Sequence, residues 1–350
     1  MRTGTKMLAA AAALAGISLT ATAQADEIRV LNWNGYGTDE AWAVEAFTKA
    51  TGHTVTHDYF NSEQEMLTKL RTNPGAYDVV LINSAYTVQA KEEGLIGPVD
   101  TSSIENFKNV APNLAKDDDL VPGGVVYGVP WVWGLTSFAY NTTALDSAPE
   151  SINIFWDESL KGKVGWRDDP LESVQMAALA TGQNINNIND LDAVRSKLED
   201  LMPQIKALWS SENDWNQFMA AGDFVIAPYW SGSASRSKNK GLPIQFVVPK
   251  EGAIGWLDGL SIPTGSKHKA AAAAFIDWMI DPEFYVEWAK SGGAPASANT
   301  AAAAALPEDD MNRSVLGDPE VVARVQFMKP VSEDKRKVYL EMWQELKALQ

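Results

Sequence analysis

The stretch YDVVLI, which runs from Tyr77 to Ile82, decides the fold class of this chain. Apart from Asp78 and the leading tyrosine it is aliphatic, and such a run is typical of a strand buried on both faces in a parallel sheet. It ends at Asn83-Ser84, where the next helix is expected to begin. The stretch therefore predicts a buried strand followed by a helix, which is the repeating unit of α/β proteins.

The segments before this strand continue the same alternation. Residues Ile28–Trp33 (IRVLNW) lead into a turn sequence at 34–37, so they predict a strand and a tight loop. Thr38 is expected to cap a helix that ends at Gly52. A strand at 54–60 and a helix at 63–71 are expected next. Because ligands of such sheets gather at the carboxyl ends of the strands, residues 33–36 and 84–86 are candidate site segments.

A second α/β unit is predicted after Gly134. Residues Thr136–Asn141 read as a strand that leaves the first unit, and GWLDGLSIP at Gly255–Pro263 reads as a strand that returns to it. The other expected elements are strands at 163–167, 224–229 and 244–248, and helices at 170–181, 191–201, 269–280, 300–305 and from about 333 to 349. With 350 residues, the chain is long enough for two such units.

The first 25 residues have the pattern of an export signal. Arg2 and Lys6 precede an apolar run at Met7–Leu19, and a small-x-small cleavage sequence follows at Ala23–Ala25. The mature chain is therefore predicted to begin at Asp26. The apolar run is too short for a membrane-spanning helix. Because the chain has no cysteine, neither a disulfide nor a lipid anchor is expected, and a free, monomeric periplasmic protein is predicted.

The charge of the chain limits its partners. The formal net charge is −16, and removal of Arg2 and Lys6 with the signal would make it −18. An acidic surface argues against nucleic acid and anionic membranes as partners, because both require clustered lysine and arginine. The acidity is compatible with a cationic ligand and equally with simple solubility.

Patterns for catalysis and metal binding are missing from the sequence. There are three histidines, and His53 and His57 are separated by β-like residues, so too few ligands exist for the usual metal sites. A nucleophile elbow, a P-loop and a dinucleotide fingerprint are also missing. We therefore expect neither a metal nor another cofactor. An enzyme would have to rely on the adjacent Asp168 and Asp169.

Two acidic motifs each have a structural and a functional interpretation. Asp169-Pro170-Leu171-Glu172 has the residues of a helix start, with an aspartate cap, a proline at the first position and a glutamate for a capping box. Asp168 adds an acid that a cap does not need. Trp256 and Asp258 lie two residues apart on one strand face, where a ring and a carboxylate can bind an ammonium group. The alternative is a buried ring beside a capping acid.

Six of the 13 tryptophans are expected to wall a pocket, because they lie near strand ends or glycine-rich turns. They are Trp33, Trp131, Trp133, Trp166, Trp230 and Trp256. The remaining seven are expected to be core residues, since aromatic rings bury a large area.

Five stretches together resemble the periplasmic spermidine/putrescine-binding proteins, which are solute receptors of ABC importers. They are LNWNGYG from Leu31, DVVLINSAY from Asp78, DDPLESVQMA from Asp168, YWSGSA from Tyr229 and EGAIGWLDGLSIP from Glu251. The resemblance covers essentially the whole predicted mature chain. It implies two α/β lobes, each a mixed sheet flanked by helices, with the ligand in the cleft between them. Lobe 1 would comprise residues 26–136 and 260–305, and lobe 2 residues 137–259 and 306–350.

The resemblance also implies a ligand site. Two acids would hold an amine, a tryptophan and an aspartate would clamp another, and aromatic and hydroxyl residues would complete the cleft. The residues that match are Trp33, Tyr36, Ser84, Tyr86, Asp169, Glu172, Trp230, Trp256 and Asp258. Asp169 can cap its helix and still offer an oxygen to the cleft.

The chain departs from the family pattern at three places. Gly35 stands where polyamine binders usually carry an acid, Ala294 stands near a position that is often aromatic, and Lys329 loosely matches a neutral amide. An acid is therefore lost and a cation is gained, which should weaken binding of one end of a long polycation.

The resemblance implies a receptor that captures a putrescine- or spermidine-like amine and passes it to inner-membrane permease subunits when the lobes close. One alternative is a receptor of the same fold for a quaternary-ammonium or zwitterionic, betaine-like amine, whose carboxylate would meet Lys329 or Arg167. A periplasmic enzyme on this fold is a third alternative. A receptor that signals to a membrane sensor would have the same sequence features as one that serves transport.

Overall fold

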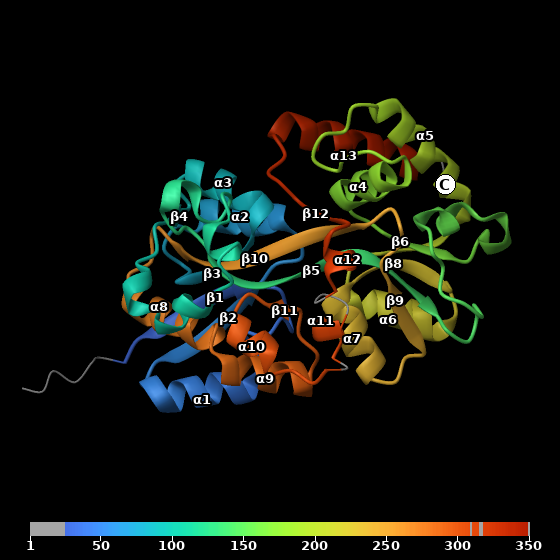
Figure 1. Ribbon diagram of the computed structural model, residues 1–350. Helices are drawn as coiled ribbons and strands as arrows, with labels where there is room; N and C mark the ends of the chain where they lie inside the picture. The colour runs from blue at the N-terminus through green and yellow to red at the C-terminus, as the bar shows by residue number, and fades with distance from the viewer. Residues whose placement is uncertain (1–24, 309, 315–317, 349–350) are drawn as a thin grey trace, which may run out of the picture.

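The computed structural model describes residues 25–308, 310–314 and 318–348. The predicted signal peptide, except for its last residue, lies outside this range. The described chain forms a mixed 12-stranded sheet with helices around it (Figure 1). Its main strand order is β2-β1-β3-β10-β5-β8-β6-β7, with β4 and β12 beside β10, and with β9 and β11 beside β5. The predicted α/β class with a mixed sheet is confirmed.

The first part of the chain builds one end of the sheet. Strands β1 and β2 pair in parallel, as do β1 and β3, so the carboxyl ends of all three lie at one edge. The elements of this part are β1 (Glu27–Asn32), α1 (Ala41–Thr51), β2 (Thr54–Tyr59), α2 (Glu63–Thr72), β3 (Val79–Asn83), α3 (Ser84–Glu92) and β4 (Ile96–Gly97). Short 3-10 turns connect β4 to the next strand.

Two long strands join the two ends of the sheet. Strand β5 (Val129–Asn141) and strand β10 (Ala253–Pro263) pair antiparallel along most of their length and cross the middle of the molecule (Figure 1). The register between them shifts after Asp258. Both segments were expected as strands, but β5 begins seven residues before the predicted Thr136. The two crossing strands therefore make one continuous sheet out of the two predicted units.

The second part of the chain builds the other end of the sheet. Strand β6 pairs in parallel with β7 and β8, and β5 pairs antiparallel with β8 and β9. Its elements are β6 (Val164–Arg167), α4 (Pro170–Ala180), α5 (Leu191–Leu201), β7 (Ile205–Trp209), α6 (Glu212–Ala221), β8 (Ile226–Trp230), α7 (Ser231–Asn239) and β9 (Ile244–Val247). Strand β7 and helices α6 and α7 were not predicted.

The last part of the chain returns to both ends of the sheet. Helix α8 covers the first end, whereas α13 packs against α4 at the second (Figure 1). The elements are α8 (Lys269–Met279), α9 (Pro282–Ser291), β11 (Ala296–Ser297), α10 (Thr300–Ala304), α11 (Met311–Ser314), α12 (Pro319–Val322), β12 (Val325–Phe327) and α13 (Glu333–Lys347). Within the described ranges, no helix combines the length and the apolar character needed to cross a membrane.

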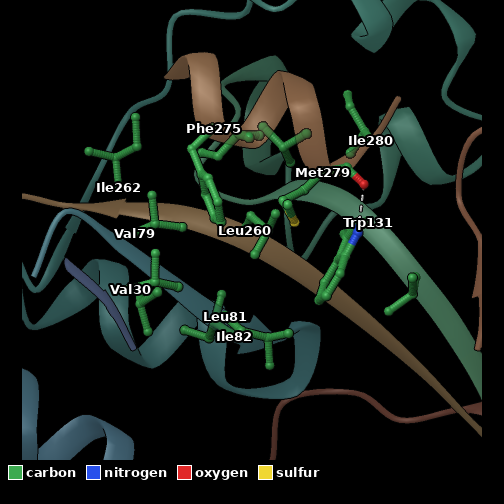
Figure 2. Packing of buried hydrophobic residues seen from close by; sticks show 14 of the residues in the cluster. Val30, Val79, Leu81, Ile82, Trp131, Leu260, Ile262, Phe275, Met279 and Ile280 are labelled. Atoms are coloured by element: carbon green, nitrogen blue, oxygen red, sulfur yellow. Dashed lines mark hydrogen bonds between the residues drawn. The ribbon is translucent and has the colours of Figure 1, made fainter. Parts of the chain in front are cut away.

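Separate hydrophobic clusters lie at the two ends of the sheet. The first packs β1, β3 and part of β10 against α8, with Val30, Leu81, Leu260 and Phe275 at its centre (Figure 2). The second packs β6 and β8 against α4, α5 and α13. The exact boundaries of the two predicted lobes stay a prediction.

Three of the six tryptophans that were expected to wall a pocket are buried members of the hydrophobic clusters: Trp131, Trp166 and Trp256. Trp131 is buried in the first cluster, where its indole N–H donates to the Met279 carbonyl at 2.9 Å (Figure 2). Trp166 is equally buried in the second cluster and donates to the Ser173 hydroxyl at 3.0 Å. The expected cap of α1 was also wrong: the helix begins after Glu40, and the Thr38 hydroxyl accepts from the Asn32 amide.

Candidate functional site

Asp258 lies at the point where the crossing strand β10 meets the end of β3. Its register partner on β3 is Asn83, whose amide Nδ2 donates to Asp258 Oδ1 at 2.9 Å. The Tyr36 hydroxyl donates to Asp258 Oδ2, also at 2.9 Å. The carboxylate is buried, and burial raises the pKa of Asp258 to about 6 although both hydrogen bonds lower it. Its two hydrogen-bond donors are neutral groups.

Tyr36 reaches Asp258 from the loop that follows β1. The ring meets Trp131 edge-on with centroids 5.7 Å apart, and Trp288 edge-on at 6.2 Å. These contacts hold the hydroxyl toward β10. Burial, together with the negative charge of Asp258, raises the pKa of Tyr36 well above its ordinary value. The tyrosine is therefore a fixed hydrogen-bond donor at neutral pH.

Glu172 is a second buried carboxylate, and it projects from the first turn of α4. Its Oε1 atom forms an ion pair with Nη1 of Arg167 and accepts from the Trp230 indole N–H at 3.3 Å and the Thr136 hydroxyl at 3.3 Å. Burial raises the pKa of Glu172, while the charge of Arg167 opposes this shift. Its Oε2 atom is buried and has no hydrogen-bond partner among the described residues. Unlike Asp258, this carboxylate has a cation beside it.

Asp169 performs the capping role that its motif predicts. It is the N-cap of α4, and its Oδ1 accepts from the Glu172 backbone N–H at 2.9 Å. Its other oxygen lies 3.8 Å from Nη2 of Arg167, so one side chain serves the helix end and the charged cluster together. The structural and functional interpretations of this motif are therefore compatible.

Asp168 has a different environment from its neighbour. It accepts from the Trp343 indole N–H at 2.7 Å and from the Lys347 ammonium group at 2.7 Å, both on α13. The extra acid of the motif thus attaches the C-terminal helix to the end of β6. Because Asp168 and Asp169 have different partners, they do not form a shared acid–base pair.

The predicted aromatic residues are placed in different ways. The Trp230 ring lies 4.6 Å from the Arg167 guanidinium carbon and packs edge-on against Trp209. Trp256 is buried, and its ring occupies the space above Gly134, where an added Cβ would come within 2.5 Å of it. Its indole nitrogen has no hydrogen-bond partner within the described part of the chain. Trp33 packs on Phe60 with ring centroids 4.5 Å apart at the end of β1.

Helix α3 contributes the two remaining predicted residues. Ser84 is buried at the first position of the helix. The Tyr86 ring lies under the guanidinium group of Arg336, whose central carbon is 3.9 Å from the ring centroid. Arg336 also donates through Nη2 to the Ala85 carbonyl at 3.0 Å. Burial raises the pKa of Tyr86, and the charges of Asp169 and Glu63 act in the same direction.

Mutual electrostatic effects connect the residues from the two ends of the sheet. Glu63, at the start of α2, has a pKa raised well above its usual range, first by burial and next by the charge of Asp258. Arg167 and Arg336 lower this pKa, and Asp169 raises it. These four groups come from β6, β10, the N-cap of α4 and α13, yet all of them act on Glu63 of α2. They form a single charged cluster, in which a small cation could be held by carboxylates.

Four residues of this cluster were not predicted as site residues: Glu63, Asn83, Arg167 and Arg336. A signal existed for two of them, because Glu63 follows β2 and Asn83 ends β3, so both belong to the same carboxyl edge as residues 33–36. Arg167 was considered only as a partner for a ligand carboxylate, whereas it pairs with Glu172 and Asp169. Arg336 lies 251 residues from its hydrogen-bond partner Ala85, and nothing local indicates that contact.

The three departures from the family pattern have separate surroundings. Gly35 has a φ of +70°, a Cβ placed there would meet nothing within 4 Å, and its N–H donates to Asp39. Ala294 is fully buried, and its carbonyl accepts from the Asn312 amide at 2.7 Å. Lys329 donates to Asp119 Oδ2 at 2.9 Å and lies 3.9 Å from Asp117 Oδ2. The gained cation is therefore paired with its own acids.

Comparisons with known proteins connect the chain with bacterial proteins that bind small solutes. A sequence model of the family described as "Bacterial extracellular solute-binding protein" matches residues 42–314. The chain is 32% identical over 349 residues to the spermidine/putrescine-binding periplasmic protein of Salmonella typhimurium, covering 98% of this chain and 97% of the relative. It is 26% identical to the putrescine/cadaverine-binding protein of Pseudomonas aeruginosa, covering 98% of this chain and 99% of that relative.

A solved structure extends the likeness to three dimensions. The spermidine/putrescine ABC transporter substrate-binding protein of Streptococcus pneumoniae, in complex with calcium and HEPES, superposes with a TM-score of 0.80. The two sequences are 26% identical, and the match covers 93% of this chain and 99% of that structure. The likeness therefore extends over nearly the whole of both chains.

Proposed function

Because this chain belongs to the bacterial extracellular solute-binding protein family, we propose that it captures a putrescine- or spermidine-like polyamine in the periplasm and delivers it to an ABC importer. Two of the relatives reported above are named as polyamine-binding proteins, and the solved structure is named as a substrate-binding protein of a spermidine/putrescine ABC transporter. The matched residues run through both ends of the sheet. Binding, and not catalysis, is the activity that we assign to the charged cluster.

One observation carries the proposal: Asp258 is a buried carboxylate that is held by two neutral donors. Burial of a carboxylate without a cation is costly, and the raised pKa of Asp258 is the sign of that cost. An ammonium group from a ligand would supply the missing positive charge. Each carboxylate oxygen has a lone pair left after its bond to Tyr36 or Asn83, so it can still accept from such a group.

The aromatic residues suit the rest of a polyamine. Its methylene chain is apolar, and burial of apolar surface is favourable by about 25 cal/mol per Å². Trp230 donates to Glu172, and Trp256 precedes Asp258 by two residues on β10. Indole rings attract cations. We assign to Trp230 and Trp256, and to Trp33, the contacts with the chain between the ammonium groups.

Closure of the two predicted lobes would complete the site. Three cationic side chains of the predicted lobe 2 reach residues of the predicted lobe 1. Arg336 donates to the Ala85 carbonyl, Arg236 donates to the Gly293 carbonyl at 3.0 Å, and Lys329 donates to Asp119. We propose that these contacts favour the closed form, in which exclusion of water strengthens the pairing of acid and ammonium. A permease could recognise that form.

A specific observation supports a second candidate ligand. Arg167 lies in the cluster, and its guanidinium could donate to a ligand carboxylate if Glu172 released it. The ligand would then be a zwitterionic or quaternary amine of the betaine kind. The two candidates differ in their charge and in the number of N–H donors, so one binding experiment distinguishes them.

The experiment is a thermal-shift screen of the mature protein after its ligand has been removed by unfolding and refolding. The panel contains putrescine, cadaverine, spermidine, spermine, glycine betaine, choline and carnitine. A ligand at about 100 times its dissociation constant adds about 2.7 kcal/mol to the stability of the folded state. A shift with di- or triamines supports the proposal. A shift restricted to betaines, choline or carnitine would replace it with the second candidate.

A further inference from the structure

Glu63 is an acid whose surroundings are not explained by the helix that it starts. It is the first residue of α2, after the N-cap Ser62, whose hydroxyl accepts from the Glu65 backbone N–H. A carboxylate in the first turn of a helix is ordinarily exposed to water, where it interacts favourably with the helix dipole. Glu63 differs, because its Oε2 atom is buried and accepts no hydrogen bond from any described residue.

Its neighbour Glu65 has the ordinary role of an acid at a helix start. Glu65 accepts from the Asn61 backbone N–H at 2.9 Å and lies 3.4 Å from the ammonium nitrogen of Lys69. These contacts lower the pKa of Glu65, whereas burial and Asp258 raise that of Glu63. The two acids are only two positions apart, but Glu65 is engaged by Asn61 and Lys69, whereas the buried Oε2 atom of Glu63 accepts no hydrogen bond from any described residue. This difference identifies Glu63 as part of the cluster.

The arginines of the cluster lower the pKa of Glu63, and Arg336 keeps one buried nitrogen, Nη1, without a hydrogen-bond partner, but neither arginine forms an ion pair with Glu63 or Asp258 among the described residues. Arg167 is paired with Glu172 and Asp169. Arg336 donates to the carbonyl groups of Val331 and Ala85 and lies over the Tyr86 ring. Glu63 and Asp258 therefore remain without an ion-pair partner in the part of the chain that the structure describes.

We propose that Glu63 is a ligand-binding residue, and that it and Asp258 together hold one primary ammonium group of the ligand between them. This inference rests on the proposed amine-binding function and adds to it. Two carboxylates that face each other repel, and a cation between them converts the repulsion into two attractive contacts. A primary ammonium group has three N–H donors and can serve both acids at once.

The presence of two acids, Glu63 and Asp258, also determines which kinds of amine the site can bind. A primary ammonium group can donate to Glu63 and Asp258 together, whereas a quaternary ammonium group has no N–H to donate. The acids at the start of α4, Asp169 and Glu172, already have Arg167 beside them, so the site should hold one end of the amine more strongly than the other.

The test compares Glu63→Gln with the matched control Glu65→Gln, using calorimetric titration with putrescine, cadaverine and spermidine. A charge-assisted hydrogen bond in a buried site corresponds to about 10- to 100-fold in affinity, so Glu63→Gln should weaken binding of the best amine by that factor. Glu65→Gln should remain within about twofold of the wild type. Melting curves of both variants without ligand establish that they fold.

A second readout is independent of the size of the affinity change. Titration in buffers of different ionisation enthalpy measures the protons released on binding. An ammonium group that holds both Glu63 and Asp258 in their ionised form should release more protons from the wild type than from Glu63→Gln. Glu65→Gln should release the same number of protons as the wild type. If the wild type binds an amine and Glu63→Gln matches it in affinity and proton release, the inference is wrong while the proposed function stands. If the wild type binds no amine in the panel, the proposed function itself fails.

Discussion

Asp258 and Glu172 are both buried carboxylates of one charged cluster, yet their partners differ. Asp258, on the crossing strand, accepts from a tyrosine and an asparagine. Glu172, on α4, is paired with Arg167 and accepts from Trp230 and Thr136. One acid is held by neutral donors and the other by a cation from its own end of the sheet.

The difference between the two acids indicates where ligand charge is needed. A paired carboxylate already has its counter-charge, and a ligand ammonium group must compete with Arg167 for it. A buried carboxylate without a cation destabilises the ligand-free protein. An ammonium group that binds beside it removes this penalty, and the free energy gained contributes to ligand binding. We therefore expect the two ends of the cluster to respond in opposite ways to removal of charge.

The largest effect is expected for Asp258→Asn. Loss of the carboxylate should weaken amine binding by about 2–5 kcal/mol, the usual cost of truncating a buried charge pair. The same change should stabilise the ligand-free protein at pH 7.5, because a pKa of about 6 corresponds to about 3 kcal/mol spent in keeping Asp258 ionised. Calorimetric titration and thermal melting measure both. A variant that binds normally, or that melts lower without ligand, would contradict this account of the unpaired acid.

Local patterns in the sequence predicted one part of this site correctly. The aspartate, proline and glutamate of the α4 start predicted a capped helix, and Asp169 caps it. The alternation of strand and helix predicted the α/β class and the edge at which the Tyr36 loop and Asn83 lie. These features depend on residues within a few positions of one another, which a single sequence displays directly.

Long-range partners could not be predicted in this way. Asp168 stood out in the sequence only as an acid that the helix cap does not need, and its partners on α13 are 175 and 179 residues away. Trp131 looked like a pocket wall because it lies near a glycine, whereas its indole bonds to a carbonyl 148 residues away. The pairing of Arg167 with both acids is local, yet the same side chain could equally have faced a ligand. Burial, which separates these cases, is decided by the assembled fold.

The largest effect on the stability of the fold is expected for Arg167→Gln, and its effect on amine binding is second to that of Asp258→Asn. Removal of the guanidinium leaves Glu172 buried without its cation, and breaking such a pair typically destabilises a protein by about 3–5 kcal/mol. Binding should respond in the opposite direction, since the freed acids can meet a second ammonium group. Spermidine should therefore gain affinity relative to putrescine. Urea unfolding and calorimetric titration provide the two measurements.

The double variant Arg167→Gln/Glu172→Gln is the control for this effect. It removes both charges, so it should recover most of the stability that the single variant loses and should not gain affinity for spermidine. Equal stabilities of the single variant and the wild type would mean that the ion pair contributes nothing to the fold.

A smaller effect is expected from pH. Only ionised Asp258 attracts an ammonium group, so amine affinity should fall by about tenfold per pH unit below its pKa of about 6. The contribution of Asp258 to the stability of the ligand-free protein changes with pH in the opposite direction. Because the pKa of Asp258 is higher in the folded than in the unfolded chain, the folded state binds more protons between about pH 4 and pH 6. The contribution of Asp258 to stability should therefore decrease as pH rises through that window.

Titrations from pH 5 to pH 8 test the pH effect, with Asp258→Asn as the control. Two titratable groups are coupled to Asp258: its charge raises the pKa of Glu63 and that of Tyr36, and the Tyr36 hydroxyl donates to it. Tyr36 stays protonated throughout this range. The control should therefore lose most of the decline in affinity below pH 6 and keep only the part that belongs to Glu63. An unchanged profile in Asp258→Asn would assign the titration to another group.

The smallest effect is expected for Lys329→Gln, and its size distinguishes two roles for this cation. The Lys329 side chain is 48% exposed and pairs with Asp119, so as a contact between the predicted lobes it should contribute less than about 1 kcal/mol. Amine affinity should then fall by no more than about fivefold, mainly through faster dissociation. Asp119→Asn should have the same effect, and the double variant should lose no more than either single one. If Lys329 instead meets a ligand carboxylate, Lys329→Gln should reduce betaine binding far more than Asp119→Asn does. If Lys329→Gln and Asp119→Asn reduce amine affinity equally, the role of Lys329 is to stabilise the closed form. Recognition of the amine then depends on the acids at the centre of the cluster.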